Sequence, residues 1–269
     1  MDDRTVSCHG LPFLLTCAAL TLASLIPAGL RAEEVPAAAR MGTLHGFLLL
    51  RDANGKVIAT GDQVDVAEGN RVRARLTFHF LDGSVDDEEA IFSQGRTFQL
   101  IHDHHVQKGP SFPKPLDLTI DVPKGEVTWT EDSKKGPQHK HMDLPSDLVN
   151  GMVSLAVQNF PHGAGRMQVS YLVIESGPRV VHFIVTPDGS DKTLIGSQSR
   201  EARRFNVHIE IGGVAGVLAS AFGKQPPDFK MWVLGPSVPV FIKLAGALYE
   251  GGPVWTMTLA APSWTENGR

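Results

Sequence analysis

The sequence predicts a mainly β protein: a highly curved antiparallel meander rolled toward a barrel, with one amphipathic helix packed in it or over it. Turn-type glycines recur every 12 to 16 residues between Gly55 and Gly125, which leaves room for hairpin-linked strands of about eight to eleven residues. The runs between these glycines alternate apolar and polar residues, as strands with one buried face do. A helical period interrupts this pattern at Ser146–Asn159.

The first half of the chain supplies the clearest strands. They begin at Thr43, and Asn54-Gly55 is a two-residue hairpin signal. Leu116–Asp121 alternates, and so does Arg71–Phe80, whose apolar face consists of Val72, Ala74, Leu76, Phe78 and Phe80. The other face of that strand carries Arg71, Arg73 and Arg75, which we interpret as a solvated stripe.

An acidic run, Asp82–Glu89, begins at the turn after Arg71–Phe80. It lacks the glycine and glutamate positions of an EF-hand loop, so it does not predict a Ca²⁺ site. We interpret it as a solvated hairpin whose charge protects a strand edge.

The longest alternating run lies within Ile91–Pro115 and contains several histidines. One face of the predicted strand carries Phe98, Leu100, His102, His104 and Val106; the other carries Thr97, Gln99, Asp103, His105 and Gln107. Because the first set begins with large apolar residues, this pattern predicts that His102 and His104 turn toward the core.

The second half resumes the meander after the predicted helix at Ser146–Asn159. The predicted strands are Arg166–Glu175, Pro178–Pro187, Lys192–Arg200, Arg203–Ile211, Phe229–Leu234, Pro239–Leu244 and Val254–Leu259. Gly212–Pro227 is small, apolar and almost uncharged. It has two interpretations, a lid or lip that touches lipid and a short buried helical turn that closes one end of the roll.

The N-terminus predicts export. Leu11–Leu30 is apolar and uncharged, and Leu30-Arg31-Ala32 is a candidate processing site. We therefore divide the chain into a signal peptide at 1–32, a linker at 33–42 and a single β-rich domain at 43–264, located in the periplasm or cell envelope. An uncleaved membrane anchor is the alternative. Both cysteines lie in the leader, so the mature chain is expected to have no disulfide and no thiolate nucleophile.

Composition and motifs exclude several classes of function. The net charge of −4 and the lack of clustered Lys and Arg argue against a nucleic-acid partner. The chain has no G-x-S-x-G elbow, P-loop or G-x-G-x-x-G fingerprint. A pair of catalytic carboxylates stays open, because such residues meet only in the fold.

The histidines are the candidate metal ligands. His102 and His104 are two residues apart on one strand, so both project to the same side, where they would chelate one transition-metal ion. The sequence identifies no third ligand, although His139 and His141 repeat the spacing with Asp143 on the same face, and His79 is another candidate. The alternative is that both histidines lie half exposed at the strand end, hydrogen-bonded to backbone. Apart from this metal, no cofactor is expected.

A rolled sheet of this size encloses more volume than its own side chains readily fill. An apolar pocket is predicted along Leu76, Phe78, Phe98 and Leu100, with His102 and His104 orienting the ligand. The leading hypothesis is a non-enzymatic exported protein that binds a lipid or another hydrophobic molecule. The alternatives are a metal-dependent periplasmic enzyme centred on His102 and His104, and a structural envelope protein. Envelope proteins or a membrane surface are the expected macromolecular partners.

Two short segments, Leu144–Met152 (LPSDLVNGM) and Leu248–Trp255 (LYEGGPVW), accompany the leader and the hairpin meander. With these features the chain resembles uncharacterised exported bacterial all-β proteins classed as domains of unknown function. The resemblance implies a mainly β exported protein and brings no known activity. In shape alone, a rolled sheet around a helix is also similar to periplasmic lipoprotein carriers.

Overall fold

A computed structural model describes residues 34–131, 136–175, 177–195, 198–212, 226–235 and 239–265. The chain divides into two compact units, Met1–Arg31 and Ala32–Arg269. The predicted signal peptide lies outside the described residues and stays a prediction. Among the described residues, no helix has the length and apolar character needed to cross a membrane.

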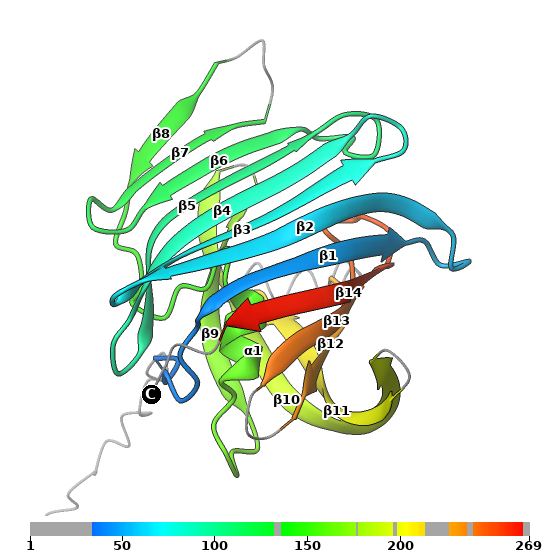
Figure 1. Ribbon diagram of the computed structural model, residues 1–269. Coiled ribbons are helices and arrows are strands. Elements are labelled where there is room, and N and C mark those ends of the chain that lie inside the picture. The colour runs from blue at the N-terminus through cyan, green and yellow to red at the C-terminus, as the bar shows by residue number, and fades with distance from the viewer. Residues whose placement is uncertain are drawn as a thin grey trace, which may run out of the picture. The chain divides into compact units, whose positions relative to one another are not determined.

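The second unit is built on one antiparallel sheet of 14 strands (Figure 1). The first eight strands are β1 (Thr43–Arg51), β2 (Val57–Glu68), β3 (Arg71–Phe80), β4 (Val85–Gln94), β5 (Phe98–Lys108), β6 (Leu116–Asp121), β7 (Glu126–Thr130) and β8 (Gln138–His141). A short helix, α1 (Val153–Gln158), follows. The last six strands are β9 (Met167–Ile174), β10 (Pro178–Ile195), β11 (Gln198–Glu210), β12 (Phe229–Leu234), β13 (Val240–Gly246) and β14 (Trp255–Thr265).

The strand order is β8-β7-β6-β5-β4-β3-β2-β1-β14-β13-β12-β11-β10-β9. Each strand therefore pairs with its sequence neighbour, except that β1 pairs with β14 and joins the two halves. The two edge strands, β8 and β9, do not pair with each other, so the sheet is rolled but not closed. The predicted fold class, a mainly β curved meander with one helix, is confirmed.

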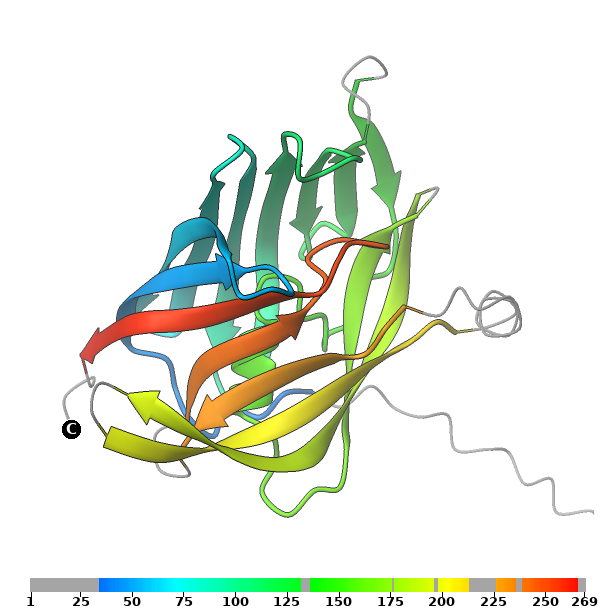
Figure 2. The same cartoon turned by 90° about the vertical axis from the view of Figure 1, so that its right-hand side faces the viewer.

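The sheet curves around α1, so that β3–β8 and β10–β13 lie on opposite sides of the helix (Figure 2). The concave face of the sheet is the face that carries α1. The helix contacts β12 and β13, and the segment before it lies on β4 and β5, where Gly151 approaches Ala90 and Asp103. A continuous apolar core fills the space between these walls, and its largest fully buried side chains include Phe78, Phe92, Phe98 and Phe205.

The helix is shorter than the predicted Ser146–Asn159, and that prediction is wrong for residues 146–152. The segment before α1 is held instead by the edge strand β9. Leu148 forms a parallel bridge with Ser170, and the Asn150 side-chain amide donates to the Leu172 carbonyl at 2.9 Å and accepts from the Leu172 N–H at 2.8 Å. Gly151 then takes a φ of +67°, which an α-helix does not allow. These contacts satisfy backbone groups of an edge strand that would otherwise be unpaired.

The strands after the helix are also fewer and longer than predicted. Pro178–Pro187 and Lys192–Arg200 were predicted as separate strands with a turn at Asp188-Gly189. In the structure β10 runs through this site, and its register with β11 shifts between Pro187 and Ser190. Arg204 of β11 bonds Asp188 at 2.9 Å and Asp191 at 2.8 Å, so one guanidinium spans the irregularity from the neighbouring strand. The site is a bulge rather than a turn.

Two predicted segments have other outcomes. The described part of the predicted linker, residues 34–42, lies against the sheet: Val35 is fully buried, and the Ala39 N–H donates to the Asn159 side chain at 2.7 Å. Most of Gly212–Pro227 lies outside the described residues, so neither interpretation of that segment is tested.

Candidate functional site

Polar side chains gather in the middle of the concave face. Strand pairing aligns Gln63, Leu76, Glu88, His105 and Leu118 in one row across β2 to β6. A neighbouring row contains Asp103, and the row on the other side contains Asp86 beside Gln107. Side chains on one face of paired strands lie close together. Asp86, Glu88 and Asp103 therefore form an acidic cluster around His105.

A bulge in β5 turns this cluster inward. Ile91 pairs with His102, whereas Phe92 pairs with Leu100, so Ile101 is an extra residue without a partner in β4. An extra residue reverses the alternation of a strand. Phe98 and Leu100 are buried before the bulge, and Asp103 and Gln107 are buried after it.

The same bulge overturns the predicted orientation of His102 and His104. Both lie on the convex face, and His104 is exposed and hydrogen-bonded to Asp117 at 3.0 Å. Within the described ranges, no group of three or more His, Cys, Asp or Glu side chains is arranged to hold a metal ion. The metal hypothesis at His102 and His104 thus gains no third ligand from the described residues.

His105 is the positive centre of the acidic cluster. Its Nε2 donates to Asp86 Oδ1 at 2.7 Å, and its Nδ1 lies 3.8 Å from Glu88 Oε1. Burial by itself lowers the pKa of His105, but Glu88, Asp86 and Asp103 outweigh that effect and raise its pKa to about 10. His105 is therefore an imidazolium at neutral pH.

The other two carboxyl groups of the cluster lack such a direct hydrogen bond to His105. Asp103 is fully buried, and in the described part of the chain neither of its oxygens has a hydrogen-bond partner. Glu88 Oε1 is likewise buried and unpartnered. Burial raises the pKa of Asp103 well above its usual range, and the charge of Glu88 adds to the effect. Burial also raises the pKa of Glu88, although the imidazolium of His105 opposes this.

Three other elements surround the acidic cluster. Gly151 lies over Asp103, so closely that a Cβ atom there would be 2.7 Å from Asp103 Oδ1. Gln107 donates to the Leu248 carbonyl of the β13–β14 loop at 2.9 Å. Tyr171 of β9 lies on the opposite wall, where its ring stacks on that of Phe183 with 4.6 Å between the ring centroids. Its pKa is raised well above the usual range by burial and by the three carboxyl groups.

The four apolar residues of the predicted pocket do not share one environment: three are packed in the core and one is partly exposed. Phe78, Phe98 and Leu100 are 0%, 1% and 4% exposed and belong to the packed core. Leu76 is only partly buried and stands next to Glu88 in the same row. Leu116 and Tyr171 are also partly buried apolar side chains. Partly exposed apolar surface on the concave face therefore lies beside the acidic cluster, not along the phenylalanines.

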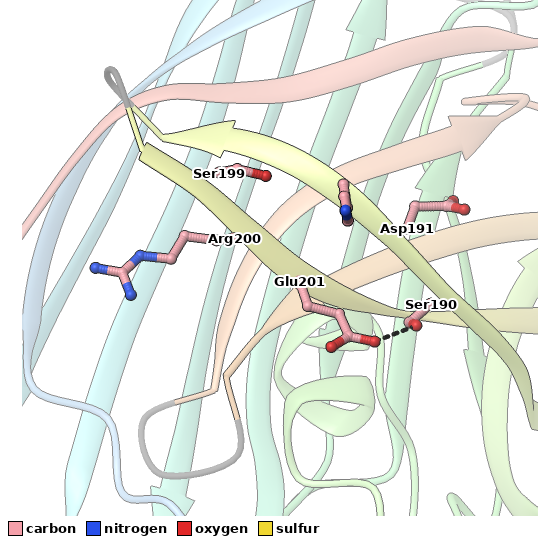
Figure 3. Close-up of a pocket in the computed structure, with 6 residues that line it drawn as sticks. Ser190, Asp191, Ser199, Arg200 and Glu201 are labelled. Carbon is pink, nitrogen blue, oxygen red and sulfur yellow. Dashed lines mark hydrogen bonds between the residues drawn. The ribbon is translucent and has the colours of Figure 1, made fainter.

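Two hollows of the described surface lie elsewhere. One, of about 530 Å³, is lined by Ser190, Asp191, Lys192, Ser199, Arg200 and Glu201 of the β10–β11 hairpin (Figure 3). The other, of about 300 Å³, adjoins Phe160 and Phe205. The first is polar and open, and neither contains a residue of the predicted pocket.

Sequence reasoning missed the acidic cluster because Asp82–Glu89 was interpreted as a solvated hairpin. That interpretation holds for Asp87 and Glu89, which pair on the convex face with Arg75 and Arg73 at 2.7 Å and 2.6 Å. It is wrong for Asp86 and Glu88. Their positions alternate with the buried Ala90 and Phe92 on the same strand, and this period was the available signal.

A rolled, open antiparallel sheet with a lined concave face is compatible with a non-enzymatic binding role. Its arrangement is similar to the crystal structure of a beta-barrel-like protein of domain of unknown function DUF1849 from Brucella abortus, with a TM-score of 0.51 and 10% sequence identity. The match covers 85% of this chain and 100% of that chain. No protein-family model and no curated protein matches the sequence. The likeness confirms the resemblance to an all-β domain of unknown function, and at this identity it shows the fold alone.

Proposed function

We propose that this chain is an exported, non-enzymatic binding protein whose ligand is a lipid or another hydrophobic molecule held on the concave face of the sheet. The observation that carries the proposal is that apolar and polar side chains lie next to each other on this face. Leu76 is partly exposed, and the neighbouring side chains of Glu88 and His105 are 20% and 13% exposed. Binding sites for small molecules typically combine apolar walls with a few polar groups that orient the ligand.

The apolar part of the ligand would lie on Leu76 and Leu116 and meet Tyr171 from the opposite wall. All three side chains are partly buried against the core, so a ligand that covers them removes apolar surface from water. Phe78, Phe98 and Leu100 would support the site from behind. Because these three are already packed, they offer no room to a ligand.

Titration with a fluorescent analogue of a long-chain alcohol, which carries no charge, tests binding. The purified protein should bind the analogue, and Leu76→Trp should weaken binding about tenfold, a change of about 1.4 kcal/mol, without loss of stability. Leu81→Trp is the matched control, since Leu81 is 74% exposed in the β3–β4 turn. If wild-type protein fails to bind the analogue, the binding proposal is wrong, and the structural envelope alternative gains support.

Export is the second part of the proposal and rests on the uncharged run Leu11–Leu30. N-terminal sequencing of material from the periplasm should start at Glu33 or within the next few residues. Full-length chain in the membrane fraction would contradict cleavage and favour the anchor alternative.

A further inference from the structure

The acidic cluster has more acceptor capacity than its surroundings satisfy. Glu88 Oε1 and both oxygens of Asp103 are buried and, in the described part of the chain, have no hydrogen-bond partner. Unpaired buried acceptors destabilise a fold, and folded proteins rarely keep them without a reason. Asp103 is aimed into the cluster, because it lies on the same face of β5 as His105 and close enough to Glu88 for their charges to interact.

The charges of the acidic cluster also indicate that it lacks a partner. The imidazolium of His105 bonds Asp86 and balances one carboxylate of the cluster. The same ring reaches Glu88 only at 3.8 Å, from Nδ1 to Oε1, and in the described part of the chain Asp103 accepts no hydrogen bond from a cation. Among the described residues, the other elements packed on the cluster supply no further cation: β9 contributes the phenol of Tyr171, and the segment before α1 contributes the backbone of Gly151. One more positive charge would let a second carboxyl group ionise with a partner.

We propose that the hydrophobic ligand carries a primary ammonium group, which binds at Glu88 and Asp103. This inference rests on the proposed function, since it specifies the head group of the same ligand. An ammonium group has three N–H donors, and Glu88 Oε1 with the two oxygens of Asp103 offers three acceptors that have no hydrogen bond within the described residues. The apolar chain would extend from there across Leu76, which adjoins Glu88 in the same row.

An organic ammonium fits better than a metal ion. The described residues hold no group of three or more side chains in a metal-binding arrangement. A metal ion demands short bonds in a fixed geometry, whereas an ammonium group binds through rotatable hydrogen bonds. Glu88 is 20% exposed and Asp103 is covered by Gly151, so the head group would enter past Glu88 toward Asp103.

Three ligands with the same chain length and different head groups test the inference. Dodecylammonium, dodecanol and dodecanoate are each titrated against the bound fluorescent alcohol analogue at pH 7. Dodecylammonium should displace the analogue at a concentration at least about tenfold lower than dodecanol, and dodecanoate should be the weakest competitor. Calorimetry in two buffers of different ionisation enthalpy should detect proton release with dodecylammonium and none with dodecanol.

Two variants and one control complete the experiment. In Asp103→Asn, the concentration of dodecylammonium that displaces the analogue should rise close to that of dodecanol. The concentration of dodecanol needed should not change. Glu88→Gln gives the same readout should Asp103→Asn fold poorly. Asp117→Asn should keep the preference, because Asp117 is a 59% exposed carboxylate on the convex face. Equal displacement by the alcohol and the amine would overturn the ammonium assignment while sustaining the binding proposal. If the protein binds neither the analogue nor any of the three ligands, the proposed function is refuted instead.

Discussion

Asp65 provides a test of how burial on the concave face controls stability. This residue of β2 is fully buried, and its partner is the Gln63 amide, which donates to its two oxygens at 3.4 Å and 3.2 Å. The strand neighbours opposite it are Leu44 and Ala74. Burial raises the pKa of Asp65 from 3.8 to about 7, and the bond from Gln63 only partly opposes this.

The sign of the effect follows from linkage. Because the folded-state pKa is above the unfolded-state value, the folded protein holds the Asp65 proton more tightly. The resulting stabilisation is fully present below pH 3.8 and is lost as the pH rises through 7. At about 1.4 kcal/mol per pKa unit, the shift corresponds to about 4 kcal/mol, which is an upper value for a single buried carboxyl group.

Asp65→Asn should remove this contribution. The free energy of unfolding, measured by urea denaturation from pH 4 to pH 8, should fall with pH less steeply in the variant than in the wild type. Relative to wild type, the variant should gain up to about 4 kcal/mol between the two ends of this range. Glu68→Gln, an exposed carboxylate at the end of the same strand, is the control and should leave the slope unchanged. Parallel curves for Asp65→Asn and wild type would refute the reasoning.

Three further substitutions test the packing of the roll. Gly151→Ala places a Cβ atom 2.5 Å from the Ala90 Cβ at a φ of +67°, and should lower the free energy of unfolding by about 1–3 kcal/mol. Gly163→Ala, with φ +77° and open space around it, controls for backbone strain, and an equal loss there would contradict the steric argument. Leu100→Trp should cost a similar 1–3 kcal/mol in thermal denaturation, because its site is packed; an unchanged melting temperature would indicate an unfilled space. Asn150→Ala unpairs the Leu172 backbone, so hydrogen exchange at the Leu172 amide should accelerate, and unaltered protection would show that Asn150 does not hold the edge strand.

The β class, most strand positions and the burial of Phe78, Phe80 and Phe98 were predictable from the sequence. Alternation within an unbroken strand such as Arg71–Phe80 is a local property, since successive side chains point to opposite faces whatever the neighbouring strand is. Phe78 is accordingly buried and Arg73 exposed, as the pattern predicts. The interior position of Leu76 on the concave face is predictable in the same way, but its partial exposure is not.

The site itself was decided by tertiary structure. Whether β5 carries a bulge at Ile101 depends on its register with β4, and that single extra residue exchanges His102 and His104 for Asp103 and His105 on the concave face. The end of the predicted helix at Ser146–Asn159 depends likewise on bonds between Asn150 and Leu172, 22 residues later in the chain. Sequence periodicity records the geometry of one segment at a time, whereas bulges, edge pairing and buried charge clusters arise from contacts between segments, and those contacts select which residues face the interior.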